Sequence, residues 1–190
     1  MTLPCPAFLE CTLRDGGYVI DFQFTEADTE TIGGALDQAG FPYIEVGHNI
    51  GLGASEQGLH VAAASDLQYM QAPARSIKQG KWGMFCIPAI ATLDHVRLAA
   101  DQGMNFIRIG TDVTKVDSPA PFITLARERG IEGFSNFMKS YVLTPDEFSR
   151  VAARAAEHGA EMVYLVDSAG GMLPTEVRDY IQATKADAPG

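Results

Sequence analysis

The stretch "TPDEFSRVAARAAEHGAEMVYLVDSAGG" (Thr144–Gly171) contains a helix followed by a strand, each with clear local signals. Thr144 can cap a helix, Pro145 suits its first turn, and Gly159 can end it. The run Met162–Asp167 is apolar almost throughout rather than alternating, which is typical of a parallel strand covered by helices. A polar, glycine-containing loop then follows. One strand–helix period of the fold can therefore be read from these residues.

The same alternation extends toward both ends of the chain. Further strands are predicted at Ala7–Leu13, Tyr43–Gly47, Trp82–Ile87, Phe106–Gly110 and Glu132–Met138. Further helices are predicted at Thr25–Gly40, Thr92–Gly103, Ser118–Gly130 and Leu173–Ala186, most of them opening on a capping residue. Strands and helices that alternate with short connections indicate βαβ units and a parallel sheet.

A parallel sheet of this kind occurs in two folds, the doubly wound sheet and the (β/α) barrel. A doubly wound nucleotide-binding sheet loses its main support because neither GxGxxG nor a P-loop follows any predicted strand. We therefore predict an α/β fold of the (β/α)8 TIM-barrel type, with six of the eight β/α units present. Residues 1–190 are expected to form a single, partial TIM-barrel catalytic domain.

Composition limits the classes of function. With 46% hydrophobic residues, 190 residues can bury a substantial core. No apolar run approaches the roughly 20 residues that cross a bilayer, and the first residues lack the features of a secretion signal. The net charge of −10 argues against nucleic acid or membrane as a partner. Three cysteines without CxxC spacing indicate reduced thiols, so we expect a cytoplasmic protein.

Charged residues gather at the predicted strand ends, where a barrel carries its chemistry. "TLRDGGY" (Thr12–Tyr18) places Arg14 beside Asp15, and the second strand carries Glu45. Asp15 suits a hard divalent cation, Arg14 could stabilise an enolate or hold a carboxylate, and Glu45 could orient Arg14. An ion-pair network that only closes the barrel is the structural alternative. If strand geometry persists, Arg14 and Asp15 point in alternating directions and need not pair.

Three motifs taken in order resemble a known superfamily. "TLRDGGY", "IEVGHNIGLGAS" (Ile44–Ser55) and "YLVDSAGGMLP" (Tyr164–Pro174) are similar to the metal-dependent superfamily of HMG-CoA lyase and isopropylmalate synthase, and within it to the 4-hydroxy-2-oxovalerate aldolases. The likeness runs over nearly the whole chain. It implies a divalent-metal-dependent aldolase, a carbon–carbon lyase that cleaves a 4-hydroxy-2-oxo acid to pyruvate and an aldehyde through a pyruvate enolate.

The resemblance also implies roles for individual residues. Asp15 corresponds to a ligand of Mn²⁺ or Mg²⁺, and Arg14 to the catalytic group that stabilises the enolate. Glu45 supports that arginine. Ser168 corresponds to a contact with the substrate carboxylate, and Asp167 positions its loop.

Tyr18 departs from the family pattern. The aldolases have a histidine at this position, thought to be the base on the 4-hydroxyl of the substrate. A tyrosine with an ordinary pKa of about 10 is a poor base at neutral pH. The base could therefore be Tyr18, His48 or a water, or it could be absent. His48 could contact substrate or be a hydrogen-bonded structural group.

The metal site shows a second departure. The family completes it with a His-x-His motif on the seventh strand, whereas no such pair occurs in this chain. We therefore expect the remaining metal ligands beyond residue 190, and expect residues 1–190 alone to associate or to belong to a longer polypeptide. A Claisen-type acyl transferase and a non-catalytic barrel that binds a partner are the alternative functions. The expected partner is a small 2-oxo acid, and the family resemblance suggests a homo-oligomer or an aldehyde dehydrogenase partner.

Overall fold

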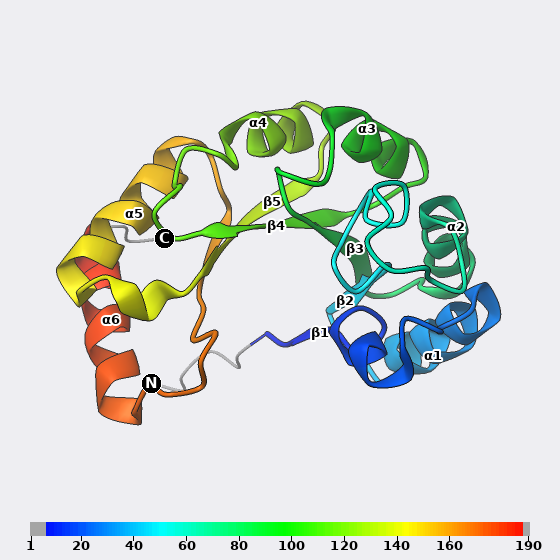
Figure 1. The fold of residues 1–190 in the computed structure, drawn as a ribbon, viewed down its shortest axis with the longest axis horizontal. Coiled ribbons are helices and arrows are strands. Elements are labelled where there is room, and N and C mark those ends of the chain that lie inside the picture. The colour runs from blue at the N-terminus through cyan, green and yellow to red at the C-terminus, as the bar shows by residue number, and fades with distance from the viewer. Residues whose placement is uncertain (1–6, 188–190) are drawn as a thin grey trace. The chain divides into compact units, whose positions relative to one another are not determined.

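Strands and helices alternate along the chain in the computed structural model, which describes residues 7–187 (Figure 1). The strands are β1 (Leu9–Glu10), β2 (Tyr43–Val46), β3 (Lys81–Cys86), β4 (Phe106–Asp112), β5 (Glu132–Met138) and β6 (Met162–Leu165). The α-helices are α1 (Glu26–Gln38), α2 (Asp66–Ser76), α3 (Leu93–Asp101), α4 (Ala120–Glu128), α5 (Pro145–Glu157) and α6 (Pro174–Asp187). Two 3₁₀-helices, η1 (Asp15–Ile20) and η2 (Ser140–Val142), follow β1 and β5.

The strands form one sheet in the order β1-β2-β3-β4-β5-β6. Strands β1 and β2, β2 and β3, and β5 and β6 pair in parallel, with Leu9 opposite Tyr43, Tyr43 opposite Lys81, and Phe134 opposite Met162. Spatial order that follows chain order is typical of barrel-type α/β folds, because doubly wound sheets reverse direction at a switch point. The predicted α/β fold with six β/α units is confirmed.

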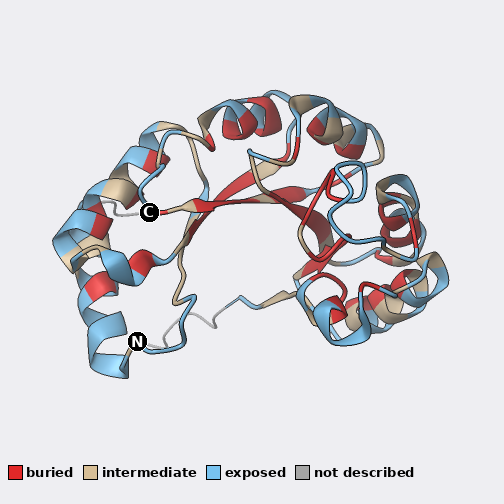
Figure 2. Ribbon diagram, viewed as in Figure 1, coloured by how far each residue is buried: buried red, intermediate tan, exposed pale blue. Residues whose placement is uncertain are grey.

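Contacts divide the chain into two compact units, Met1–Ile107 and Arg108–Gly190. Buried residues lie along strands β2 to β5 and on one side of most helices (Figure 2). In the second unit, Phe148 of α5 packs edge-on against Phe137 of β5 and Tyr180 of α6, at centroid distances of 6.4 and 5.8 Å. A single domain over residues 1–190 stays a prediction.

Four helices begin in a reciprocal capping box, in which the capping side chain and the third helical residue each bond the other's backbone N–H. The pairs are Thr25 with Asp28, Ser65 with Gln68, Thr92 with His95, and Thr144 with Glu147. The cap predicted at Ser118 is wrong, because α4 starts after Pro119 and has no side-chain cap. Instead, Ser118 Oγ donates to the carbonyl of Lys115.

Helix α2 is absent from the sequence-based prediction. Pro73 lies inside it, and proline in a helix interior removes a backbone donor and disfavours the helix. The capping box of Ser65 and Gln68 fixes its start nonetheless. Within residues 7–187, no helix is long and apolar enough to cross a membrane. Cys86 is a buried free thiol, and Cys5 lies outside the described residues.

Strand β1 is shorter than predicted, and this change places the site. It covers Leu9–Glu10 rather than Ala7–Leu13. The chain turns at Cys11, whose carbonyl accepts hydrogen bonds from the backbone N–H groups of Arg14 and Asp15 at 3.1 and 2.7 Å. The motif residues thus sit on a tight turn that leads into η1, and not on an extended strand.

Candidate functional site

Arg14 is the centre of the site in the first unit. Its side chain is 10% exposed, and Nε donates to Oε1 of Glu45, which is fully buried, at 2.5 Å. Nη1 donates to Oδ1 of Asp15 at 2.8 Å and to the backbone oxygen of Asn49 at 3.3 Å. The guanidinium carbon lies 4.7 Å from the ring centroid of Phe85. The strand ends and η1 therefore hold this cation on several sides.

The Arg14–Glu45 contact carries a desolvation cost, since both charges are removed from water. A close pair offsets that cost, yet such pairs are weak evidence for stability. Among residues 7–187, Nε and Nη1 of Arg14 donate hydrogen bonds, whereas Nη2 donates none. A planar guanidinium presents a rigid fork of donors to a carboxylate or an enolate. Glu45 thus contacts Arg14 directly, while its role in orienting Arg14 for a substrate stays a prediction.

Arg14 and Asp15 pair, although the extended-strand argument left them unpaired. The difference arises because β1 ends at Glu10 and Arg14 caps η1, so the alternation of a strand does not apply. The Asp15 side chain remains 60% exposed. It can therefore present a carboxylate to a ligand while one oxygen accepts from Arg14.

The described side chains supply few ligands for a metal ion. No group of three His, Cys, Asp or Glu side chains that could hold a metal ion occurs within the described part of the chain. Divalent cations need several ligands in fixed geometry, and Asp15 supplies one. The described residues therefore do not fit a complete metal site, and the role of Asp15 as a ligand stays a prediction.

Tyr18 lies on η1 with its ring half exposed. Its hydroxyl donates to the backbone oxygen of Asn49 at 3.3 Å. Partial burial raises its pKa, and the charge of Asp15 acts in the same direction against that of Arg14. The phenol is thus a protonated donor at neutral pH.

His48 follows β2 and is buried. Its Nδ1 accepts a hydrogen bond from the backbone N–H of Ile50 at 3.1 Å, which leaves the proton on Nε2. Nε2 faces the carbonyl of His60 at 3.4 Å, and burial lowers the pKa of the ring. This geometry matches the structural alternative for His48, while a contact with substrate stays a prediction.

Ser168 belongs to the second unit. Its Oγ accepts a hydrogen bond from the backbone N–H of Lys139 at 3.0 Å. The carboxylate of Asp167 accepts from the N–H groups of Met172 and Gly170 at 2.7 and 3.0 Å, so it shapes the loop as predicted. These bonds, that of Met172 first, lower the pKa of Asp167. Substrate binding by Ser168 stays a prediction.

Sequence reasoning missed Asn49. This residue is 4% exposed, and its Nδ2 donates to the backbone oxygen of Arg14 at 2.6 Å. Its own backbone oxygen accepts from both Arg14 and Tyr18. The signal was a polar amide in the glycine-rich loop directly after a strand, where side-chain amides often bond to backbone.

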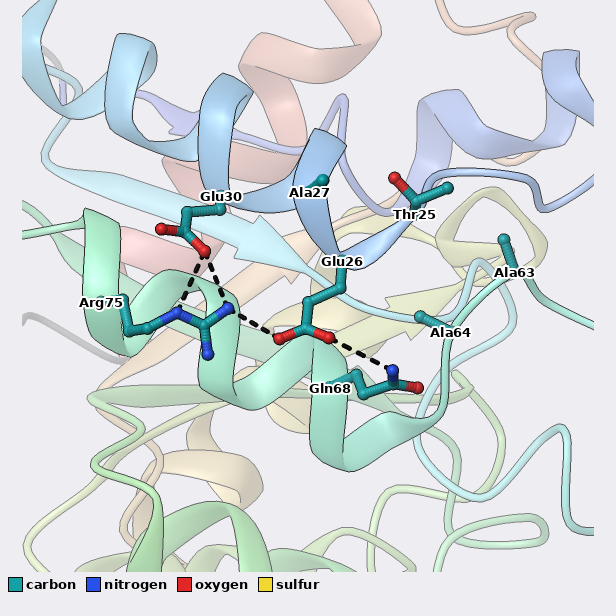
Figure 3. Close-up of a pocket in the computed structure, with 8 residues that line it drawn as sticks. All are labelled: Thr25, Glu26, Ala27, Glu30, Ala63, Ala64, Gln68 and Arg75. Atoms are coloured by element: carbon teal, nitrogen blue, oxygen red, sulfur yellow. Dashed lines mark hydrogen bonds and ion pairs between the residues drawn. The ribbon is translucent and has the colours of Figure 1, made fainter.

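A cavity of about 380 Å³ lies elsewhere in the first unit, between α1 and α2 (Figure 3). Arg75 crosses it and donates to Glu26 and Glu30 at 2.7 Å each, and Gln68 donates to Glu26. The side chains of these ion pairs are 31% to 46% exposed. Such a network fastens two helices, and the cavity is lined by none of the predicted site residues.

Comparisons with known proteins agree with this architecture. The chain is 36% identical over 181 residues to an oxaloacetate decarboxylase of Mycobacterium tuberculosis, covering 95% of this chain and 53% of the relative. It is 36% identical over 178 residues to a 4-hydroxy-2-oxovalerate aldolase of Carboxydothermus hydrogenoformans, covering 94% and 53%. The chain thus spans about half the length of the curated relatives it matches.

Solved structures share the fold. The HMG-CoA lyase of Brucella melitensis superposes with a TM-score of 0.71 at 16% identity, over 97% of this chain and 70% of that one. The carboxyl transferase domain of Rhizobium etli pyruvate carboxylase, solved with pyruvate and biocytin, gives 0.79 at 14% identity, over 99% and 35%. The predicted TIM-barrel type is confirmed. The HMGL-like family model matches residues 5–189, and the chain belongs to the HMGL-like family.

Proposed function

We propose that this chain supplies the enolate-binding half of a divalent-metal-dependent aldolase that cleaves a 4-hydroxy-2-oxo acid to pyruvate and an aldehyde. One observation carries the proposal: a buried arginine at the strand ends is held by the buried carboxylate of Glu45 at 2.5 Å. Relatives in the same family are enzymes, named as aldolases and as a decarboxylase. Because the chain spans about half of those relatives, the activity is proposed for the protein that contains it.

The chemistry places Arg14 at the pyruvyl end of the substrate. Breaking the bond between C3 and C4 leaves an electron pair on C3, which is delocalised onto the C2 oxygen as an enolate. The N–H donors of Arg14 stabilise that oxygen more strongly as its negative charge grows. Glu45 keeps the guanidinium in one orientation, so little reorganisation is needed during the reaction.

The proposed cofactor is Mn²⁺ or Mg²⁺. When bound, such an ion would polarise the 2-oxo group and the carboxylate of the substrate. Asp15, with its carboxylate 60% exposed, would supply one ligand. The other ligands are expected outside the described residues.

Decarboxylation is a second candidate reaction, and the hydrogen bond of Tyr18 favours it. Aldol cleavage needs a base for the 4-hydroxyl proton, whereas the Tyr18 phenol, with its pKa raised by burial, stays protonated and donates a hydrogen bond to Asn49. A 2-oxo acid with a 4-carboxylate needs no such acceptor. Its C3–C4 bond breaks to release CO₂, the electron pair passes to the enolate, and a proton from solvent completes pyruvate. The Mycobacterium relative named oxaloacetate decarboxylase supports this candidate.

Further properties of the whole protein are proposed from the family resemblance. These are a cytoplasmic location and either a homo-oligomer or an aldehyde dehydrogenase partner, which would consume the aldehyde product. Size-exclusion chromatography with light scattering tests the first assembly, and co-purification tests the second.

The deciding experiment follows deuterium exchange into the pyruvate methyl group with and without Mn²⁺. Exchange that needs both protein and Mn²⁺, and that falls in Arg14→Lys, is the expected result. Parallel assays with 4-hydroxy-2-oxovalerate and oxaloacetate then separate aldol cleavage from decarboxylation, after subtraction of the rate with Mn²⁺ alone. Absence of exchange would refute the lyase and favour a binding module, and condensation that requires acetyl-CoA would favour the acyl transferase.

A further inference from the structure

Asn49 forms hydrogen bonds with the backbone of Arg14, the side chain of Arg14 and the hydroxyl of Tyr18. Its side-chain Nδ2 donates to the backbone oxygen of Arg14 at 2.6 Å. Its backbone oxygen accepts from Arg14 Nη1 and from the Tyr18 hydroxyl, both at 3.3 Å. Because Asn49 follows β2 closely, it ties the turn that carries Arg14 to the strand that carries Glu45.

Gly17 provides the space in which the Asn49 amide lies. A Cβ atom added at Gly17 would stand 2.3 Å from Nδ2 and 2.6 Å from Oδ1 of Asn49. The three atoms nearest to that Cβ all belong to the Asn49 amide. Gly17 is not among the glycines with positive φ, so its backbone would accept an alanine. The glycine is therefore required by contact with Asn49 rather than by backbone conformation.

We infer that Asn49 is a positioning residue of this site, and that its amide, seated against Gly17, holds Arg14 and Tyr18 in place. The inference rests on the proposed function for its catalytic consequence. Asn49 acts through Arg14, because its side chain bonds the Arg14 backbone and leaves the guanidinium to its own acceptors. A small displacement of a charged group at a reacting centre can lower a rate by about 10²-fold.

The contact also keeps the Tyr18 hydroxyl in a donor role. With the Asn49 backbone oxygen fixed, the phenol proton has an acceptor close by and η1 is pinned at both Arg14 and Tyr18. Loss of the amide frees the first turn of η1. The expected result is a lower rate of enolate formation in a protein that remains folded.

Three variants and one matched control test this inference. Asn49→Ala removes the amide, Gly17→Ala displaces it, and the double variant places the new Cβ in the vacated space. Asn105→Ala is the control, because the side chain of Asn105 bonds backbone of the first unit away from the candidate site. Its Oδ1 accepts from the N–H of Trp82 in β3 at 3.0 Å. Each is assayed for the kcat and KM of Mn²⁺-dependent pyruvate proton exchange and for its melting temperature.

Each single variant is expected to lose about tenfold or more in kcat, with a smaller change in KM, while Asn105→Ala keeps its kcat. The double variant is expected to be no slower than Asn49→Ala, since both changes act on one contact. A kcat within twofold of wild type for Asn49→Ala would overturn the inference. Multiplied losses in the double variant would overturn the coupling between the two residues.

A second readout does not depend on turnover. The Arg14 Nε–H group, bonded to Glu45, gives an NMR signal whose exchange with water reports how firmly the guanidinium is held. Faster exchange is expected in Asn49→Ala and Gly17→Ala and not in Asn105→Ala. If wild-type protein fails to exchange pyruvate protons, the proposed function falls. Unchanged Nε–H exchange in both single variants would, separately, sink the positioning role.

Discussion

The two units carry ion pairs at their strand ends in opposite environments. In the first, the Arg14 and Glu45 side chains are 10% and 0% exposed, with Nε and Oε1 2.5 Å apart. In the second, Lys139 and Asp112 are 57% and 31% exposed, with Nζ and Oδ2 3.3 Å apart. Similar residue types at similar places in the fold thus differ in their exposure to water.

The difference separates a candidate site from ordinary surface charge. Water and salt screen the pair of Lys139 and Asp112, so its retention needs no special reason. The pair of Arg14 and Glu45 is buried at a cost in desolvation, and a well-packed apolar pair would serve stability as well. A costly pair beside an exposed Asp15 fits the ligand site proposed above.

Glu45→Gln should have the largest effect. It removes the buried carboxylate beside Arg14 and leaves the exposed Asp15 as its charged partner. We therefore expect the free energy of unfolding to fall by about 3 kcal/mol, the lower end of the range for a broken buried pair. Urea unfolding at neutral pH measures it, with Asp112→Asn as the matched change in the second unit. An equal loss in both variants would break the comparison.

Arg14→Lys should affect turnover more than folding. An ammonium keeps the charge but loses the bidentate fork, so pyruvate proton exchange should slow by about 10²–10³-fold. The melting temperature should fall less than in Glu45→Gln. Unchanged exchange in this variant would remove Arg14 from the mechanism.

Tyr18→Phe should change which substrate is cleaved and leave enolate formation intact. Without its hydroxyl, the residue loses its bond to Asn49 but leaves the contact of Arg14 with Glu45 intact. The lost hydroxyl could also no longer orient the 4-hydroxyl of a 4-hydroxy-2-oxo acid, a group that pyruvate and oxaloacetate lack. We expect aldol cleavage to slow by about tenfold or more, with pyruvate proton exchange and decarboxylation close to wild type. If all three activities fall together, Tyr18 belongs to the shared machinery.

The pH dependence of stability should differ between the units. Burial lowers the pKa of His48 in the folded protein. Below the unfolded pKa of about 6.5, the unfolded chain therefore binds a proton that the folded ring does not, and the free energy of unfolding decreases as the pH decreases. Hydrogen bonds from Thr114, and then from Lys139, lower the pKa of Asp112 to about 2, so its contribution is present above about 4 and is lost toward pH 2. Urea unfolding from pH 7.5 to 3 should show the first decline, and His48→Asn should remove it.

Lys139→Ala should have the smallest effect. Its ion pair is exposed, and we expect no measurable change in melting temperature or in Arg14 Nε–H exchange. A large loss of stability would show that exposure does not separate the two pairs.

The sequence predicted those parts of the fold that local signals specify. Strand β5 was predicted with its observed ends, Glu132–Met138, because this short run, which contains Phe134, Phe137 and Met138, lies between two helix patterns. The helix starts at Thr25, Thr92 and Thr144 were found because a capping residue acts on its own helix. The Arg14–Glu45 contact followed from parallel strands that end at one edge.

The missed features depend on the tertiary structure or on a stronger competing signal. Helix α2 was not predicted because it contains Pro73, which disfavours a helix. Packing and the cap at Ser65 outweigh the cost of the backbone hydrogen bond that proline removes. Pairing of Arg14 with Asp15 depends on the turn at Cys11, which the strand pattern did not reveal. The inferred role of Asn49 depends on its contact with Gly17, which lies 32 residues away in the sequence. Patterns in a single sequence show local structure and do not reveal contacts between residues so far apart.

The capping boxes have a consequence for how such a protein can change. In a barrel-type fold, the loops after the strands carry the chemistry, and each ends where the next helix begins. At Ser65, Thr92 and Thr144, the start of the helix is fixed by a capping box that spans only four consecutive residues, from the capping residue to the third helical residue. The loop before each box can then be lengthened, shortened or exchanged while the helix keeps its register on the sheet. Loop grafts that end immediately before these residues are thus the natural joints at which new substrate specificities can be introduced into this scaffold.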